Sequence, residues 1–539
     1  MKNGFLKTIG FSLALFVIVL SSGCKNKGQY QQIRFHMNEE PLTLDPQVAN
    51  DYSANILIMN IFEGLVRIDN NNNVIPGLAE SWESSNQDKT FTFHLKKDAK
   101  WADDQTPVTA EDFLYGIKRA VNPGTKSETA KLLYIIKNAR GINLNEISLD
   151  KLGVSAADNH TLKIDLEYSF KDFPRLCTLP VAMPCNKKFF ESTTGQYGKD
   201  SKKLLTNGPF RISNSGWERG SSVNIVKSES YCRKEDRAFT PMVTFFLKKD
   251  SKISDEELLR NGEVDVCSLT KNQHPEIIKE DKFSIASFKD TCFGVLFNCS
   301  SDIFKSENMR KAFLSAIDRD YITSKLPEQN LPRADNILPE EILLGGKKYR
   351  DIAPDKVFFK PDPNPRSLFA SALKEIKLPS INNLTLLCSE EENTKYVANN
   401  LLEVFNKNLS QHFNIKAVSR KGLEEAILAG DFAIAFAPIV FKSENPIDFL
   451  NYFRSTHAQN PAKLNSSSYD KLLKDAESNA SPKDAVSLIF EAEKYISDHA
   501  IFYPVCSEDT FFVSNKKTQD VVFHPYQLGI DFSFAKKTR

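Results

Sequence analysis

The sequence lacks the features that mark several large classes of protein. Its 70 lysine and arginine residues are balanced by 69 aspartate and glutamate residues, which leaves a formal net charge of +1. Nucleic-acid-binding proteins normally carry a strongly basic face or tail, so this balance predicts no nucleic-acid partner. The composition, 41% hydrophobic and 26% charged, is that of an ordinary globular protein. At 539 residues the chain exceeds the size of one hydrophobic core, which predicts two to four domains.

Motifs of common enzymes are also absent. The chain contains no GxSxG, HExxH, GxxxxGKS/T or GxGxxG pattern. Acidic pairs such as Asp103-Asp104 lie in turn contexts, where solvated charge is the usual state. We expect the histidines to be surface or satisfied core residues, namely His36, His94, His160, His274, His412, His457, His499 and His524. The sequence therefore predicts a protein that is not an enzyme.

The cysteines show no metal-binding arrangement. No CxxC pair occurs, and no histidine lies at zinc-ligand spacing beside a cysteine, so we expect neither a metal site nor a cofactor. Apart from Cys24, the cysteines are Cys177, Cys185, Cys232, Cys267, Cys292, Cys299, Cys388 and Cys506. Most are expected in the core as small apolar residues, and the sequence leaves one or two disulfides open.

The N-terminus reads as an export signal. Lys2 and Lys7 precede an apolar run at 9–20, which is short for a membrane span but suits a signal-peptide core. The following "SSGC" ends at Cys24 and resembles the lipobox of bacterial lipoproteins, although Ser21 stands where leucine is usual. We expect Cys24 to be lipidated; the alternative is a plain secretory signal with an incidental cysteine. No later stretch has the length of a transmembrane helix, so the mature chain is expected to be soluble but tethered.

Hydrophobic periodicity predicts an α/β protein. Alternating residues indicate strands at 91–97 and 159–168. Between them, Thr109 and Asp112 form a capping pattern at the start of a helix that extends to Val121. After residue 290 an amphipathic helix is expected at 306–322, followed by alternating strands and helices. That alternation predicts βαβ units and a parallel or mixed sheet.

One segment carries a family resemblance. "GLAESWESSNQDKTFTFHLKKDAKWADDQTPVTAEDF", Gly77 to Phe113, resembles the signature region of the extracytoplasmic solute-binding proteins of ABC importers that take oligopeptides, dipeptides and nickel. Trp82 and Trp101 are its expected core anchors, and turns are expected at 86–88 and 103–105. Further motifs follow the family's order: "EPLTLDP" (40–46), "NIFEGLVRID" (60–69), "TNGPFRI" (206–212), "LRNGEVDV" (259–266) and "NMRKAFLSAIDRD" (308–320).

The resemblance implies a two-lobed periplasmic-binding-protein fold of the large class, with a ligand cleft between the lobes and an extra strand-rich domain. Hinge motion would close the lobes over the ligand. The two chain crossings are expected near Asp290 and Ala500. The implied division is a signal peptide at 1–23, a lipid-anchored tether at 24–32, lobe I at 25–62, 188–290 and 501–539, accessory domain II at 63–187, and lobe III at 291–500.

The resemblance also implies where a ligand would bind. Oligopeptides in this family lie extended and pair with backbone from both lobes, a form of β-augmentation. The matching segments here are 438–440 and 51–54. An aspartate just after the second-lobe strand usually pairs with the peptide α-ammonium, and the matching position is Lys442. The implied ligand-binding set is Tyr52, Ser53, Ile439, Val440, Lys442 and Glu444.

Lys442 is a departure from the family pattern, because an ammonium cannot accept a hydrogen bond and like charges repel. Three interpretations stay open. The loop is shifted, and Glu444 or Asp448 supplies the carboxylate; Lys442 pairs with an anionic group of the ligand; or the N-terminus of the ligand is blocked or absent. Cys292 matches a family cysteine whose usual partner position is here Val440, so Cys292 is expected to be free or differently paired.

The sequence therefore predicts a monomeric, lipid-anchored substrate-binding protein in the periplasm or on the outer face of the cell membrane. It would capture short peptides and deliver them to an ABC permease with separate ATPase subunits. The alternatives are the same fold with a non-peptide ligand, such as a nickel chelate, haem or another anionic solute, and a surface protein without a transport role.

Overall fold

The computed structural model describes residues 30–538 with internal gaps. The gaps fall at 38, 70–72, 104, 168, 233–237, 248–252, 271–276, 327–330, 341, 345–346, 355–356, 358, 382, 442–445, 458, 478–481 and 525–528. Among the described residues, no helix combines the length and the apolar character needed to cross a membrane.

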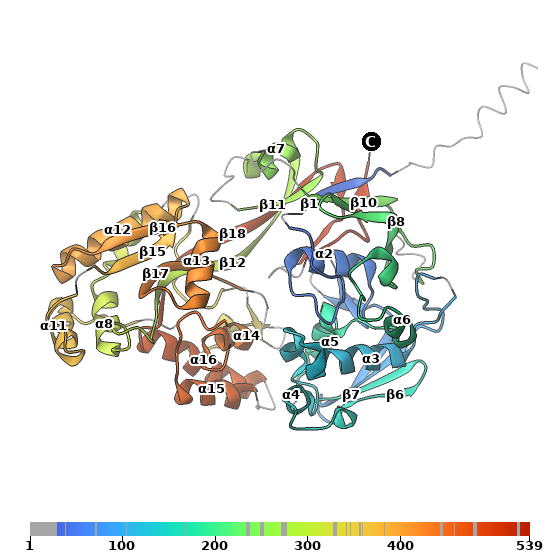
Figure 1. The fold of residues 1–539 in the computed structure, drawn as a ribbon, viewed down its shortest axis with the longest axis horizontal. Coiled ribbons are helices and arrows are strands. Elements are labelled where there is room, and N and C mark those ends of the chain that lie inside the picture. Colours follow the sequence, from blue (N-terminus) through green and yellow to red (C-terminus); the bar gives the residue numbers. More distant parts are fainter. Residues whose placement is uncertain are drawn as a thin grey trace, which may run out of the picture.

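A single ten-stranded mixed sheet extends through the molecule (Figure 1). Its spatial order is β16-β15-β17-β12-β18-β11-β1-β10-β9-β8. In that order the strands are Asn414–Val418, Thr385–Ser389, Ile434–Val440, Phe283–Phe297, Phe502–Asn515, Val266–Thr270, Ile33–Met37, Met242–Leu247, Ser222–Lys227 and Phe210–Glu218. The pairs β15–β16, β15–β17, β1–β10 and β1–β11 are parallel, and the others are antiparallel. The predicted α/β class with a parallel or mixed sheet is confirmed.

Two long antiparallel strands join the halves of this sheet. The end of β18 lies between β11 and the start of β12, whereas the end of β12 lies between β17 and the start of β18 in the other half. Figure 1 shows β12 and β18 extending from the half that contains α12 (Glu392–Leu409) and α13 (Arg420–Ala429) toward the half that contains α2 (Tyr52–Ile61). The ladder between them has register shifts at Lys289/Thr291 and at Phe293/Gly294. These strands give the molecule its two-lobed form.

A separate four-stranded antiparallel sheet has the order β4-β5-β7-β6, formed by Ala79–Ser85, Thr90–Leu95, Thr161–Asp165 and Val154–Asp158. The turn between β4 and β5 has positive φ at Asn86, Gln87 and Asp88. Helix α3 (Ala110–Val121) packs on this sheet. The Thr109 backbone N–H donates to Asp112 Oδ2 over 2.8 Å, so the predicted capping pattern is confirmed. Trp101 is fully buried, as expected of a core anchor, while Trp82 is partly buried.

The helix expected at 306–322 is two helices. Helix α8 (Glu307–Ser315) ends near Ala316, and α9 starts again at Arg319 and ends at Ser324. The Asp318 side chain accepts a hydrogen bond from Tyr321 N and so caps the second helix. The apolar pattern continues across this break, which explains why the prediction of a single helix was wrong.

The apolar core is divided along the chain. One cluster joins the four-stranded sheet to the part of the large sheet around β1 and β10. Two further clusters cover opposite faces of the large sheet at β12 and β17. The helices on one face are α8, α11 (Pro365–Glu375) and α12 (Glu392–Leu409), and those on the other face are α13 (Arg420–Ala429), α15 (Ser467–Glu477) and α16 (Pro482–Asp498). All eight cysteines after Cys24 are free thiols. Cys292 is therefore unpaired, as predicted, and the option of one or two disulfides is not realised.

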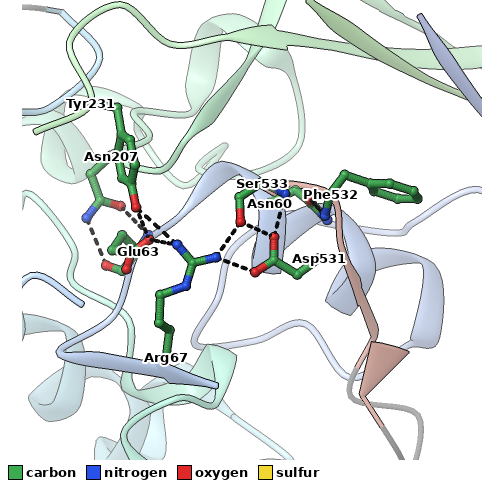
Figure 2. A network of polar contacts seen from close by, with 8 residues as sticks. All are labelled: Asn60, Glu63, Arg67, Asn207, Tyr231, Asp531, Phe532 and Ser533. Carbon is green, nitrogen blue, oxygen red and sulfur yellow. Dashed lines mark hydrogen bonds and ion pairs between the residues drawn. The ribbon is translucent and has the colours of Figure 1, made fainter. Parts of the chain in front are cut away.

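A buried polar network fastens the C-terminal segment to the first helix (Figure 2). Arg67, in β2 (Val66–Ile68), lies between Glu63 and Asp531 and donates to Asp531 and Ser533. Asn60, in α2 (Tyr52–Ile61), accepts from Phe532 N over 2.8 Å and donates to the Ile530 carbonyl over 2.6 Å. The first and last parts of the described chain are thereby held in one lobe.

Candidate ligand-binding site

Strand β17 has a partly free edge. On one side it pairs with β12 along its whole length, from Ile434 to Val440. On the other side its pairing with β15 stops at Phe436. Residues 437–440 therefore have no strand partner on that side among the described residues, and they include the predicted Ile439 and Val440. An extended backbone could add to this edge, except that Pro438 offers no N–H donor.

The segment expected to face this edge is helical. Asp51 is the N-cap of α2, and its side chain accepts from Ala54 N over 2.7 Å. Tyr52 and Ser53 are the first two residues of the helix. An extended 51–54 segment that pairs with a ligand backbone is therefore not what the structure shows. Contacts from this segment would have to be made by side chains.

A buried charged group lies where β12 and β18 pass between the lobes. Asp290 occupies the first register shift and is 4% exposed. Its Oδ1 accepts from the hydroxyls of Thr510 over 2.9 Å and Thr291 over 3.2 Å. Burial raises the pKa of Asp290 above its ordinary value, although these hydrogen bonds and the charge of Arg420 act in the opposite direction. The hydrogen bonds and the charge of Arg420 therefore offset only part of the effect of burial on this pKa.

The charge of Arg420 acts on this group. Arg420 is the first residue of α13, and its guanidinium lies 3.4 Å from Glu508 Oε2 and 3.6 Å from Glu391 Oε1. Glu391 follows β15 and Glu508 belongs to β18, so the Arg420 side chain spans β17 and β12, where it lies 6.0 Å from the Phe293 ring centroid. Glu508 is 2% exposed, and burial raises its pKa despite the charge of Arg420.

Two of the predicted residues meet at Asp290. Tyr52 interacts electrostatically with the Asp290 carboxylate. On the other side, Val440 pairs with Thr291, and the next residue, Phe441, donates its N–H to the Asp290 carbonyl over 2.7 Å. Sequence reasoning placed a chain crossing near Asp290 but assigned it no ligand role. The available signal was an acidic residue, like Glu508, within an otherwise apolar strand.

Other predicted positions cannot be placed. Cys24, Lys442 and Glu444 lie outside the described residues, and so does the side chain of Asp448. No group of three or more His, Cys, Asp or Glu side chains suited to a metal ion occurs within the described ranges. The roles of Lys442 and Glu444 remain predictions.

The lobes also meet at the surface. The Lys131 Nζ atom, next to the four-stranded sheet, lies 3.0 Å from Nε2 of His457, which follows the short helix α14 (Pro446–Leu450). Farther along the β12–β18 pair, an open groove of about 500 Å³ is lined by Ile285, Phe288, Val522 and Phe523 among others. Phe288 lies two residues from Asp290, so apolar surface adjoins the charged group.

The fold and this interlobe arrangement define the class: two lobes joined by a pair of strands, as in the two-lobed binding proteins that close over a solute. The family model of bacterial extracellular solute-binding proteins, family 5, matches residues 73–461. The chain belongs to this family, whose members serve ABC importers.

Comparisons with individual proteins agree. The chain is 27% identical over 98% of its length to the dipeptide-binding protein DppE of Bacillus subtilis, of which it covers 99%. It is 28% identical over 88% of its length to the periplasmic murein peptide-binding protein MppA of Escherichia coli, of which it covers 87%. The substrate-binding domain of an oligopeptide ABC transporter from Bacillus anthracis superposes with a TM-score of 0.76 at 25% identity, over 95% of this chain and 100% of that one.

The relatives also bear on the placement of the lobes. The unliganded open form of MppA gives a TM-score of 0.66, whereas another structure of MppA gives 0.76, with the same 95% of this chain and 99% of that chain covered. The contact between Lys131 and His457 joins the two lobes at the surface in this structure.

Proposed function

We propose that this protein is the substrate-binding component of an ABC peptide importer. It captures short peptides between its lobes and delivers them to a membrane permease whose ATPases are separate chains. The observation that supports this most strongly is that relatives spanning nearly the whole chain are named as dipeptide-, oligopeptide- and murein-peptide-binding proteins. The protein acts by capture and release, without catalysis, as a monomer.

The free edge of β17 supports a peptide as the ligand. Main-chain groups at 437–440 can pair with an extended peptide whatever its side chains are, which suits a carrier of many sequences. In this proposal Ile439 and Val440 contact the ligand backbone, and Tyr52 and Ser53 contact it from the other lobe. Lys442 and Glu444 follow the same strand and complete the proposed set.

We further propose that Cys24 carries a lipid, so that 24–32 forms a tether, and that the chain divides into lobe I (25–62, 188–290 and 501–539), domain II (63–187) and lobe III (291–500). The N-terminal pattern of basic residues, apolar run and "SSGC" supports the anchor. A Cys24→Ala variant should leave the membrane fraction while the wild type stays there. Equal partition of both would contradict the anchor.

The test of peptide capture uses an equimolar random pentapeptide library. We expect the protein, produced from residue 25 onward, to retain a subset of the library after gel filtration, identified by mass spectrometry. A retained peptide at one hundred times its Kd should raise the free energy of unfolding by about 2.7 kcal/mol. A mixture of free amino acids at the same total concentration is the control. Retention of no peptide would contradict the proposal and would favour a non-peptide ligand.

A non-peptide ligand has one relative in its favour. The chain is 26% identical, over 88% of its length, to a protein of Escherichia coli named as a probable deoxycholate-binding periplasmic protein. Deoxycholate is therefore the first compound to test in the same unfolding experiment if peptides fail.

A further inference from the structure

The first and last described residues meet at one corner of the lobe that contains α2. The Gln31 backbone N–H donates to the Lys537 carbonyl over 3.0 Å, and the Gln31 carbonyl accepts from the Thr240 hydroxyl over 2.6 Å. The Lys537 ammonium donates to the Gln32 carbonyl over 3.1 Å. Figure 1 marks the C-terminal end at this corner, beside β1 and β10. The segment that follows Cys24 therefore joins the folded protein at a fixed place.

An aromatic side chain is displayed at the same corner. Phe239 is 37% exposed, whereas its neighbours Ala238 and Thr240 are fully buried and hold the ring outward. The Tyr30 ring packs edge-on against the Phe239 ring, with the centroids 5.8 Å apart, and the Lys536 ammonium lies 4.4 Å from the Phe239 centroid. Aromatic rings and lysines with their stems on apolar surface are typical of the interface between a membrane and water.

Both chain ends are basic in sequence. Five cationic residues lie within 25–32 and 532–539, namely Lys25, Lys27, Lys536, Lys537 and Arg539, and neither segment contains an acidic residue. Lys536 pairs with Asp520 and Lys537 with Asp265, so part of this charge is neutralised within the protein. Because the whole chain carries a formal charge of only +1, the excess is local. It favours the anionic headgroups of a membrane as the partner of this corner.

The chain between Cys24 and the fold is short. Tyr30 is six residues after Cys24, and six residues span at most about 20 Å when fully extended. A compact chain of 539 residues has a radius of gyration of about 24 Å. A lipid on Cys24 would therefore hold this corner close to the bilayer surface, and the tether is too short for the opposite side of the molecule to take its place.

We propose that Phe239, Tyr30 and Lys536 form a docking surface that rests on an anionic bilayer. The inference rests on the lipid anchor of the proposed function and goes beyond it, because an anchor alone requires no contact between the folded lobe and the lipid. Docking here leaves the interlobe contact of Lys131 accessible. Lys131 lies beside α4 (Ala139–Asn143), and Figure 1 shows α4 at the opposite end of this half from the C-terminal end. A docked molecule can therefore still capture a peptide.

Quenching by brominated lipid measures this contact. The acylated protein with Phe239→Trp is reconstituted into vesicles of phosphatidylethanolamine and anionic phosphatidylglycerol, part of which carries brominated acyl chains. The matched control is Leu428→Trp, which places the same fluorophore at a 47% exposed position of α13 in the other lobe. The signal of the wild-type tryptophans is subtracted from both.

We expect Phe239→Trp to be quenched at least about threefold more than Leu428→Trp, because apolar side chains at an interface lie about 5–10 Å into the boundary between headgroups and acyl chains. Equal quenching of the two variants would overturn the docking surface and leave the permease as the alternative partner of this corner. Circular dichroism checks that both variants are folded.

Flotation in a density gradient separates failure of the docking surface from failure of the anchor. Protein that floats with the vesicles while the two variants are quenched equally has an anchor but no docking surface. Protein that does not float has no lipid on Cys24, and both proposals then fail. Peptide capture is measured on protein produced from residue 25 onward, so its outcome is independent of both.

The charge of the lipid tests the part assigned to lysine. Quenching of Phe239→Trp should fall about twofold or more when phosphatidylcholine replaces phosphatidylglycerol, since the attraction to anionic headgroups is lost. Adding Lys536→Gln to Phe239→Trp should have the same effect in the anionic vesicles. Lys471→Gln, at an exposed position of α15, is the matched control and should change nothing. Quenching that depends on neither the lipid charge nor Lys536 would contradict an anionic partner.

Discussion

Replacing Arg67 should damage the fold more than replacing its closest partner. Figure 2 shows Arg67 between two acids, Glu63 on one side and Asp531 on the other. The Arg67 side chain is 8% exposed, and those of Glu63 and Asp531 are 4% and 5% exposed. Burial disfavours the charge of Asp531, yet Arg67 and the Ser533 hydrogen bonds outweigh burial and lower the pKa of Asp531. The network holds two negative charges and one positive charge.

The two single replacements are therefore unequal. Arg67→Met leaves Glu63 and Asp531 both buried without their cation, and breaking a buried ion pair in this way costs about 3–5 kcal/mol. Asp531→Asn leaves Arg67 with Glu63, whose Oε2 lies 3.7 Å from Nη1, and loses a charge-assisted hydrogen bond, at about 1.5–3 kcal/mol. We expect Arg67→Met to be the less stable variant by about 2 kcal/mol.

Urea unfolding at pH 7, followed by tryptophan fluorescence and circular dichroism, measures this difference. The surface pair Lys471 and Asp475 supplies the control, because Lys471→Met removes a cation from an exposed ion pair and should cost less than about 1 kcal/mol. Asp531→Asn could prove as destabilising as Arg67→Met, or more so. That result would refute the prediction, because the balance between two buried carboxylates and one guanidinium would then not determine the stability of the network.

Four further results are expected. Burial lowers the pKa of His524 to about 4, so the protein should lose about 3 kcal/mol of unfolding free energy as the pH falls from 6.5 toward 4 and this histidine becomes protonated. The difference in unfolding free energy between the wild type and His524→Gln should change with pH over the same range. A difference that stays constant with pH would contradict this prediction. Asp112→Ala should destabilise by about 2 kcal/mol in urea unfolding through loss of the α3 cap, against less than about 0.5 kcal/mol for the exposed Glu111→Ala. Lys131→Ala removes an interlobe contact with His457, so it should raise the peptide Kd measured by calorimetry by up to about fivefold. Lys126→Ala is the control and should leave Kd unchanged. An unchanged Kd for Lys131→Ala would show that this contact does not favour closure of the lobes. All eight cysteines after Cys24 should react with a thiol reagent in urea without prior reduction, and a smaller number would reveal a disulfide.

Local features were predictable from the sequence, whereas features that depend on distant pairing were not. The Thr109–Asp112 cap and the turn at 86–88 depend on neighbouring residues, and both are present. The family motifs predicted the two-lobed fold because they are spread along the whole chain. The acidic residues Asp290 and Glu508 are more than 200 residues apart in the sequence and lie close together only because β12 and β18 pair. No local pattern records that pairing.

The expected ligand set shows the same limit. The family pattern points to Lys442, whereas the structure places the buried acidic residues Asp290 and Glu508 on β12 and β18. A residue that departs from a family pattern can be recognised from the sequence. Which acidic residues lie near one another can be recognised only when the strands are placed side by side.

The register shifts in the β12–β18 pair have a consequence for amide exchange and for the coupling of binding to movement. The peptide units between Lys289 and Gly294 lie where the ladder is interrupted, so they are the place where the connection between lobes can bend at least cost. Asp290 belongs to the same six residues. A ligand bound between the lobes would restrain the backbone about which the lobes rotate, and the exchange of these amides should then slow. Ligand binding and lobe closure would then be coupled directly through residues 289–294.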